Sequence, residues 1–425
     1  MTAMAAPATQ VATVTAARSW KLPITLGVFG LLSFVLFGLL GPAGSVTTFG
    51  ISTGADLLQF DPVAVPTRAT AIVLSVLCLL LAGYAYVRVR ADQPVGRWVL
   101  AVFGVLWVLT FLVWAVADKS TSIVSLLQGS LLLAVPLAFG ALGGLLNERA
   151  GVVNIAIEGQ LLTGAFGAAV LASVVGNAYI GLIAAPIAGL LIGAMLALFT
   201  VKYHVNQIIV GVVLNVFAVG LTSFLFSSVL KNDAATLNTP PRLPTLPIPL
   251  LSEIPIIGPV LFRQSIIVYL LYVAVIVISI ALFRTKWGLR VRSVGEYPQA
   301  ADTVGIDVNR TRWRNVLLGS MVAGLGGAFF TIGSVGAFGQ EMTAGKGYIA
   351  LAAMILGRWT PWGALGAALL FGFADKLQQV LGVLETPIPN QFMLMLPYVV
   401  TIFAVAGLVG RVRGPAAAGQ PYVKG

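Results

Sequence analysis

The chain has 425 residues, of which 58% are hydrophobic and only 9% are charged, and its mean hydropathy is +0.98. A soluble globular protein carries about 25% charged residues, so this composition excludes one and indicates an integral membrane protein. A single histidine and a single cysteine exclude a Cys/His zinc site and a disulfide scaffold, and in a membrane protein the net charge of +11 indicates basic cytosolic loops rather than a nucleic-acid partner.

Runs of about 20 mostly apolar residues, the length that crosses a bilayer as a helix, recur along the whole chain. The predicted helices lie near residues 24–41, 69–87, 98–117, 123–143, 152–173, 178–200, 206–230, 265–283, 314–335, 346–357, 363–382 and 391–410. The segment 346–357 is short for a full crossing and is either a span or a re-entrant helix. We therefore predict an all-α, polytopic integral membrane protein with about 12 spans.

Basic residues set the predicted orientation, because cytosolic loops are enriched in Lys and Arg. The densest basic segment runs from Arg284 to Arg314, and we place it in the cytosol. Counting outward with an even number of spans puts both termini in the cytosol, an N-in/C-in arrangement. The proline-rich segment 231–264 is then an extended loop on the outside.

Charged groups inside a bilayer are costly, so each needs a partner or a water-lined cavity. Glu158 lies in the string NERAGVVNIAIEG (147–159), where Gly151, Asn154 and Glu158 would share one face of a helix. That face predicts a polar translocation pathway through Asn154 and Glu158. The alternative is a buried residue hydrogen-bonded to a neighbouring helix.

A second polar stripe runs along the predicted helix 206–230. It consists of Gln207, Gly211, Asn215, Ala218 and Thr222, at spacings of three and four. Such a stripe either lines a pore, with Gln207 and Asn215 facing the solute, or allows two helices to approach closely. Because the stripe carries no charge, it favours a small neutral polar solute over an ion.

Asp375 and Lys376 are adjacent inside a predicted span and point in different directions, so they do not simply neutralise each other. Asp375 shares a face with Gly372 and Gln379 and is a further pathway candidate. Pairing of Asp375 with a residue on another helix is the alternative.

The cytosolic loop of about 287–313 carries signals for a helix of its own. Pro298 suits a first helical turn, and Gly305 suits the position just past a helix end. We predict a short helix with Ala300, Ala301 and Val304 as an apolar face. A helix this short needs a surface to dock on, so it either fits a soluble motor subunit or is an ordinary connection.

Four ordered strings resemble the permease subunits of bacterial ABC importers that serve ribose, galactose, branched-chain amino acids and nucleosides. They are NERAGVVNIAIEG, NQIIVGVVLN (206–215), GEYPQAADTVGI (295–306) and MTAGKGYIALAAMILGRW (342–359). The first string and the C-terminal GPAAAGQPYVKG (414–425) are most similar to nucleoside or simple-sugar permeases that work with a lipoprotein of the basic membrane protein type.

The resemblance covers residues 120–425 and implies a type II ABC importer transmembrane domain. It divides the chain into an N-terminal extension with about three spans (1–118), a permease core (119–413) and a cytosolic tail (414–425). It makes the string 295–306 the coupling helix for an ATPase. The motif positions of that helix are Gly295, Glu296, Pro298, Ala300, Ala301 and Gly305.

The implied partners are a second, similar permease, a cytosolic ABC ATPase and an extracytoplasmic binding lipoprotein, with membrane lipid around the spans. The chain has no G-x-x-x-x-G-K-[ST] loop, so it is not expected to be an enzyme or to hold a cofactor. ATP and Mg²⁺ are expected on the partner ATPase. The function predicted is ATP-driven nucleoside import. Simple-sugar import is the alternative, and an ion-gradient-driven secondary transporter is the alternative of another class.

Overall fold

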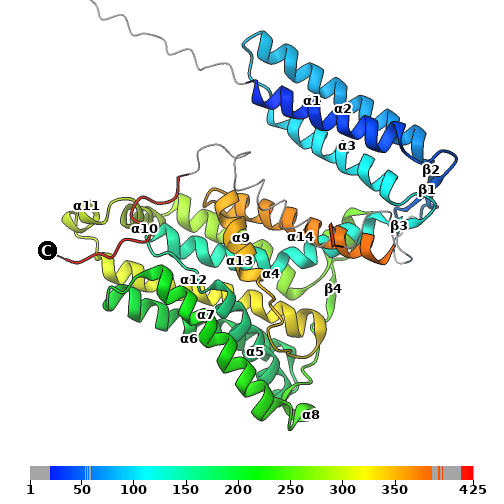
Figure 1. Cartoon of the computed structure of the whole chain (residues 1–425). Coiled ribbons are helices and arrows are strands. Elements are labelled where there is room, and N and C mark those ends of the chain that lie inside the picture. The colour runs from blue at the N-terminus through cyan, green and yellow to red at the C-terminus, as the bar shows by residue number, and fades with distance from the viewer. Residues whose placement is uncertain are drawn as a thin grey trace, which may run out of the picture. The chain divides into compact units, whose positions relative to one another are not determined.

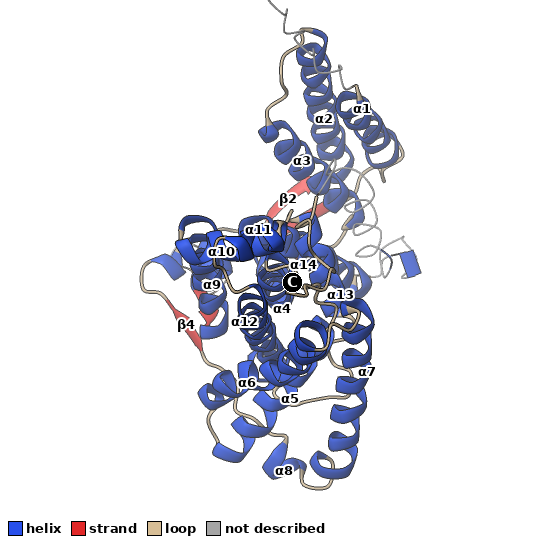
Figure 2. Ribbon diagram, turned by 90° about the vertical axis from the view of Figure 1, so that its left-hand side faces the viewer, coloured by secondary structure: helices blue, strands red, loops and turns tan. Residues whose placement is uncertain are grey.

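The computed structural model describes residues 20–52, 54, 56, 59–384, 391–392, 395 and 413–424, and these are mostly helical (Figures 1 and 2). The described part contains nine helices long and apolar enough to cross a membrane. The predicted span 391–410 lies almost wholly outside the described residues. The all-α fold class is confirmed, and the count of about 12 spans stays a prediction.

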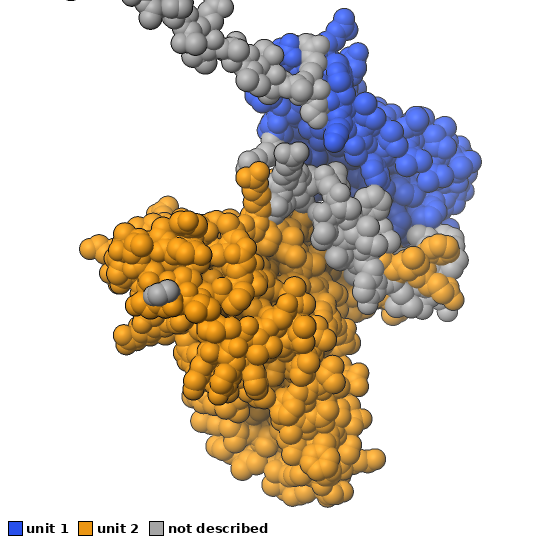
Figure 3. All heavy atoms as spheres, turned by 60° about the vertical axis from the view of Figure 1, so that its left-hand side comes forward, with its two compact units in different colours: residues 1–49, 62–121 blue, residues 50–61, 122–425 orange. Residues whose placement is uncertain are grey.

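The chain divides into two compact units (Figure 3). The first comprises residues 1–49 and 62–121. Its helices are α1 (Lys21–Ser33, continued by a π-helix to Leu39), α2 (Thr67–Arg90) and α3 (Arg97–Ala115). A small sheet joins β1 (Val46–Gly50) to β2 (Val63–Pro66) and β3 (Ser120–Ser122) in the order β2-β1-β3.

The helices of the first unit pack through small and apolar side chains and present apolar side chains outward, as spans in lipid do. Leu26, Cys78 and Phe103 are buried together between them. The hydroxyls of Ser33 and Ser75 are hydrogen-bonded at 2.8 Å. Because lipid offers no partner to a hydroxyl, such pairing between spans stabilises the bundle.

The second unit comprises residues 50–61 and 122–425. It is centred on α4 (Ile123–Arg149), whose most apolar stretch is 83% buried, and α4 packs against α12, α13 and α14. The other long helices are α5 (Ile157–Val175), α6 (Ala178–Ala197), α7 (Gln207–Leu225), α9 (Ile266–Arg284), α12 (Val308–Phe330) and α14 (Pro361–Val383). The shorter ones are α8 (Ala234–Leu237), α10 (Lys286–Glu296), α11 (Pro298–Thr303) and α13 (Lys346–Leu356), and β4 (Thr245–Pro247) pairs with β5 (Arg263–Ser265).

Glycine allows close helix contacts in the second unit, since a side chain would collide with backbone. A Cβ atom at Gly164 of α5 would lie 2.2 Å from the carbonyl oxygen of Gly324 in α12. This is the packing that small residues provide between spans.

Candidate functional site

The segment between α4 and α5 is not helical, although the sequence predicts a helix from residue 152. Residues 150–156 have irregular backbone, Gly151 has φ +88°, and α5 begins only at Ile157. The prediction that Gly151, Asn154 and Glu158 share one helical face is therefore wrong. It assumed a helical period across a stretch where glycine takes a left-handed conformation.

Side chains of α7 satisfy the backbone of this irregular segment. Gln207 Oε1 accepts from the N–H of Val153 at 2.7 Å, and Asn215 Nδ2 donates to the carbonyl of Ile155 at 2.8 Å. Asn215 Oδ1 also accepts from the N–H of Gly159 at 2.9 Å. Buried backbone N–H and C=O groups need hydrogen-bond partners, so these bonds from Gln207 and Asn215 hold the segment 150–156 in place.

Glu158 is buried in the first turn of α5 and binds the start of α13. Its Oε1 accepts from Thr343 Oγ1 at 2.6 Å and from the N–H of Gly345 at 2.8 Å, and its Oε2 accepts from the N–H of Gly347 at 2.6 Å. A carboxylate is favoured at a helix N-terminus, where N–H groups lack partners and the helix dipole is positive. The sequence analysis gave this hydrogen-bonded arrangement as the alternative to a pathway role for Glu158.

Asn154 is fully buried and donates to Gln160 Oε1 at 3.0 Å. Gln160 in turn donates to Ser320 of α12 at 2.9 Å. The sequence analysis missed Gln160, although it lies only two residues after Glu158 and is an amide inside a predicted span. The chain of bonds joins the segment 150–156 to α12.

The small and polar stripe of α7 faces the interior of this unit. A Cβ atom at Gly211 would lie 2.9 Å from the Cβ of Ile155, while Val213, Val216 and Phe224 on the other side of α7 are exposed. Of the two interpretations that the stripe allows, the structure shows close approach between α7 and the segment before α5.

Tyr348, in the first turn of α13, was not singled out by the sequence analysis. The residue is 49% exposed, and its hydroxyl accepts from Asn215 Nδ2 at 3.1 Å. The network that holds Glu158 and the segment 150–156 therefore also fixes an exposed aromatic ring. Its position in the string TAGKGYIA, beside glycines in a polar break, was the available signal.

Asp375 of α14 forms an ion pair with Lys346 at the start of α13. Lys376 turns to another side, since a Cβ atom at Gly129 of α4 would lie 2.4 Å from its Cε. The adjacent residues thus do point apart, and Asp375 has the interhelical partner that the sequence offered as an alternative. A pathway role for Asp375 stays a prediction.

The predicted short helix is present as α11, which begins at Pro298, and Gly305 follows it with φ +84°. The predicted apolar face is wrong. Ala301 is 2% exposed and packs inward, whereas Ala300 is exposed and Val304 is 76% exposed. The helix has only six residues, and Val304 lies beyond its end.

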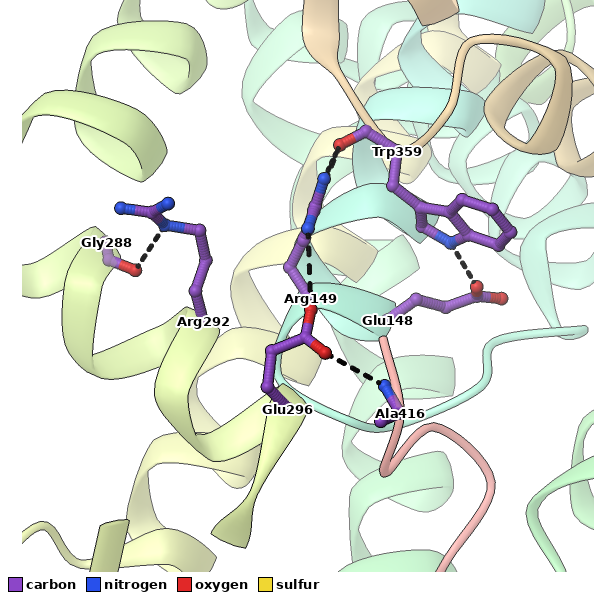
Figure 4. A network of polar contacts seen from close by, with 7 residues as sticks. All are labelled: Glu148, Arg149, Gly288, Arg292, Glu296, Trp359 and Ala416. Carbon is purple, nitrogen blue, oxygen red and sulfur yellow. Dashed lines mark hydrogen bonds and ion pairs between the residues drawn. The ribbon is translucent and has the colours of Figure 1, made fainter. Parts of the chain in front are cut away.

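Gly295 and Glu296 tie this region to the end of α4, and Figure 4 shows the contacts of Glu296. A Cβ atom at Gly295 would lie 2.2 Å from the carbonyl oxygen of Arg149, and Glu296 Oε1 lies 4.0 Å from the Arg149 guanidinium. Arg149 also donates to the carbonyl of Trp359 at 2.8 Å, and Trp359 donates to Glu148 at 2.5 Å. Glu148, Arg149 and Trp359 were missed, because their contacts join residues more than 100 positions apart.

A cavity of about 910 Å³ lies over α10, α11 and the start of α12. Its walls combine the exposed Ala300 and Val304 with the basic residues Lys286, Arg290 and Arg310. The surface around α11 is thus concave and lined by more basic than acidic side chains, since Glu296 and Asp307 also line it, and Ala300 and Val304 add exposed apolar groups.

Comparison with known proteins assigns the class. Residues 126–405 match the family described as branched-chain amino acid transport system / permease component. The guanosine ABC transporter permease protein NupQ of Bacillus subtilis (strain 168) is 39% identical over 314 residues, which cover 71% of this chain and 97% of that protein. The nucleoside ABC transporter permease protein NupC of Lactococcus lactis subsp. cremoris is 38% identical over 305 residues, covering 69% and 95% of the two chains.

The putative glucose ABC transporter permease protein TsgC13 of Haloferax volcanii is also similar, at 35% identity over 257 residues, or 60% of this chain and 76% of that protein. No solved structure matches. Relatives of this kind are transport subunits and not enzymes, and their class is that of multi-pass proteins of the cell membrane. The chain belongs to the branched-chain amino acid transport system / permease component family, and it is the permease subunit of an ABC importer.

Proposed function

We propose that the imported solute is a nucleoside. The observation that carries this proposal is the similarity to NupQ and NupC at 39% and 38% identity over nearly their whole lengths. Simple-sugar import is the second candidate, and the similarity to TsgC13 favours it. The ion-gradient alternative loses its support, because each relative named here is an ABC transporter permease.

Membership of this permease class implies a partnering ATPase and a substrate-binding protein. In finer terms, we place a second, similar permease beside this chain, an ATPase on the cytosolic side and a binding lipoprotein outside. This chain would hold no cofactor of its own, since ATP and Mg²⁺ would be bound by the ATPase. The N-terminal extension 1–118 would be an addition to the permease core 119–413.

The solute would pass between this subunit and its permease partner. In that route Asn154, Glu158, Gln207 and Asn215 act by shaping the wall, since their hydrogen bonds fix α13 and the segment 150–156. The exposed ring of Tyr348 offers an apolar face to a nucleobase. Asp375 supports the same wall by pairing with Lys346.

Coupling to the ATPase would run through α11, whose exposed residue Ala300 lies at the basic cavity. We expect Ala300→Arg to leave the protein in the membrane but to abolish uptake, because the long charged side chain occupies the docking surface without entering the core. Ala301→Arg is the contrasting variant, since residue 301 is buried and its replacement should lower the amount of folded protein.

The experiment measures uptake of radiolabelled guanosine and of glucose by cells expressing the complete transporter. Guanosine uptake that persists when the proton gradient is collapsed and ATP is maintained supports the proposal. Uptake of glucose alone would favour the sugar alternative. Normal guanosine uptake by Ala300→Arg would contradict the coupling role of α11.

A further inference from the structure

The C-terminal segment 413–424, red in Figure 1, lies against the region of α10 and α11. Pro415, Ala417 and Tyr422 are buried, and the N–H of Ala417 donates to the carbonyl of Gly295 at 2.9 Å. Chain termini are ordered only where they are tied down, so this segment has a defined site on the protein.

Tyr422 is the main anchor. Its ring packs with Val294 of α10, Ala301 of α11 and Val308 of α12. Burial and a hydrogen bond to the Asp302 carboxylate raise the pKa of the Tyr422 phenol. A six-residue helix is not stable alone, so the surface under α11, including the Tyr422 ring, fixes where α11 sits.

Arg312 of α12 is a second attachment point, and its burial is unfavourable in free energy. The residue is 2% exposed, and Nη1 donates to the carbonyl of Gln420 at 2.7 Å. Its Nε and Nη2 atoms have no hydrogen-bond partner among the described residues. Burying an incompletely paired guanidinium costs free energy that an apolar residue would not. A contact that served only to stabilise the fold would be more favourable with an apolar residue at position 312.

The segment 413–424 also lies near the segment 150–156 and near Trp359, which border the proposed solute route. A Cβ atom at Gly419 would lie 3.7 Å from the side chain of Val153, whose N–H binds Gln207 of α7. A Cβ atom at Gly414 would lie 3.0 Å from the ring of Trp359, between α13 and α14. Residues 413–424 therefore contact the helices around α11 and pass close to Val153 of the segment 150–156.

We propose that residues 413–424 form a strap that is part of the coupling element: the strap positions α11 for the ATPase and carries the displacement of α11 to the segment 150–156. This inference rests on the proposed function, in which α11 meets the ATPase. It assigns a role in coupling to Tyr422, Arg312 and the backbone of Gln420, which the coupling-helix string 295–306 does not include. A two-state element biased from both ends is the physical requirement for such transmission.

The test uses the complete transporter, with its partner subunits, in proteoliposomes. Tyr422→Ala removes the anchor ring, and Val423→Ala is the matched control because Val423 is 69% exposed. Guanosine uptake and ATP hydrolysis are measured together. We expect Tyr422→Ala to lower the guanosine taken up per ATP hydrolysed at least five-fold, with Val423→Ala unchanged and Tyr422→Phe, which keeps the ring, close to the parent protein.

An unchanged ratio of uptake to hydrolysis in Tyr422→Ala would overturn the strap. If that variant does not assemble, Tyr422→Leu, which keeps an apolar side chain in the cluster, is measured in the same way. Failure of both variants to assemble would assign residue 422 to folding and would also overturn the proposal. Ala300→Arg separates the two hypotheses, because loss of uptake there with a normal ratio in Tyr422→Ala rejects the strap and keeps the coupling role of α11.

Discussion

Replacing Glu158 by glutamine tests how the start of α13 is held. The carboxylate accepts three hydrogen bonds, from Thr343 Oγ1 and from the N–H groups of Gly345 and Gly347. In Glu158→Gln one acceptor oxygen becomes an NH₂ group that faces a donor, and the remaining bonds lose the contribution of the charge. A bond to a charged group contributes about 1.5–3 kcal/mol and a neutral one about 1 kcal/mol. The loss of one bond and the weakening of the other two therefore sum to about 2.5–7 kcal/mol.

Thermal unfolding of the purified protein in detergent measures this loss as a lower melting temperature. Glu341→Gln is the matched control, since Glu341 lies in the loop that contains Thr343 and Gly345 but is exposed. We expect Glu158→Gln to melt several degrees lower and Glu341→Gln to melt with the parent protein. Equal melting temperatures for all three proteins would refute the view that Glu158 anchors α13.

Three further substitutions test contacts around α11 and α13. Gly295→Ala places a methyl group 2.2 Å from the backbone of Arg149 and should destabilise the protein by about 1–3 kcal/mol. Gly220→Ala is the control, because its methyl group meets no atom within 4 Å and should not destabilise the protein. The melting temperatures of the two variants test this difference. Lys346→Met and Asp375→Asn should each lower the melting temperature more than the double variant does, because each single change leaves a partly buried charge without its partner. Additive effects of the two changes in a double-mutant cycle would argue against the ion pair.

The sequence alone predicts those parts of the fold that depend on local chemistry. Long apolar runs define the spans, and Pro298 and Gly305 mark the two ends of α11 as the structure has them. The prediction fails between Gly151 and Glu158, because it applied the helical period to a stretch of irregular backbone. It also fails in α11, where it placed Ala300 and Ala301 on one apolar face although only Ala301 is buried.

The remaining contacts could not be predicted from one sequence, because they depend on tertiary packing. Glu158 binds residues 185 to 189 positions away, and Arg149 binds a carbonyl 210 positions away. Sequence patterns indicated that Glu158 and Asp375 needed partners. Only the arrangement of the helices identifies Gly347 and Lys346 as those partners.

The charges around α13 bear on which solute this route suits. A helix that begins inside a membrane presents N–H groups and a positive dipole, which in many transporters attract an anionic substrate. Here Glu158 occupies those N–H groups, and Asp375 pairs with Lys346. An anionic solute would have to displace a carboxylate of the protein, whereas a neutral one needs only apolar contact and exchangeable hydrogen bonds. The exposed Tyr348, fixed by Asn215, would supply the first of these, so we expect the proposed route to favour an uncharged nucleoside over its phosphate ester.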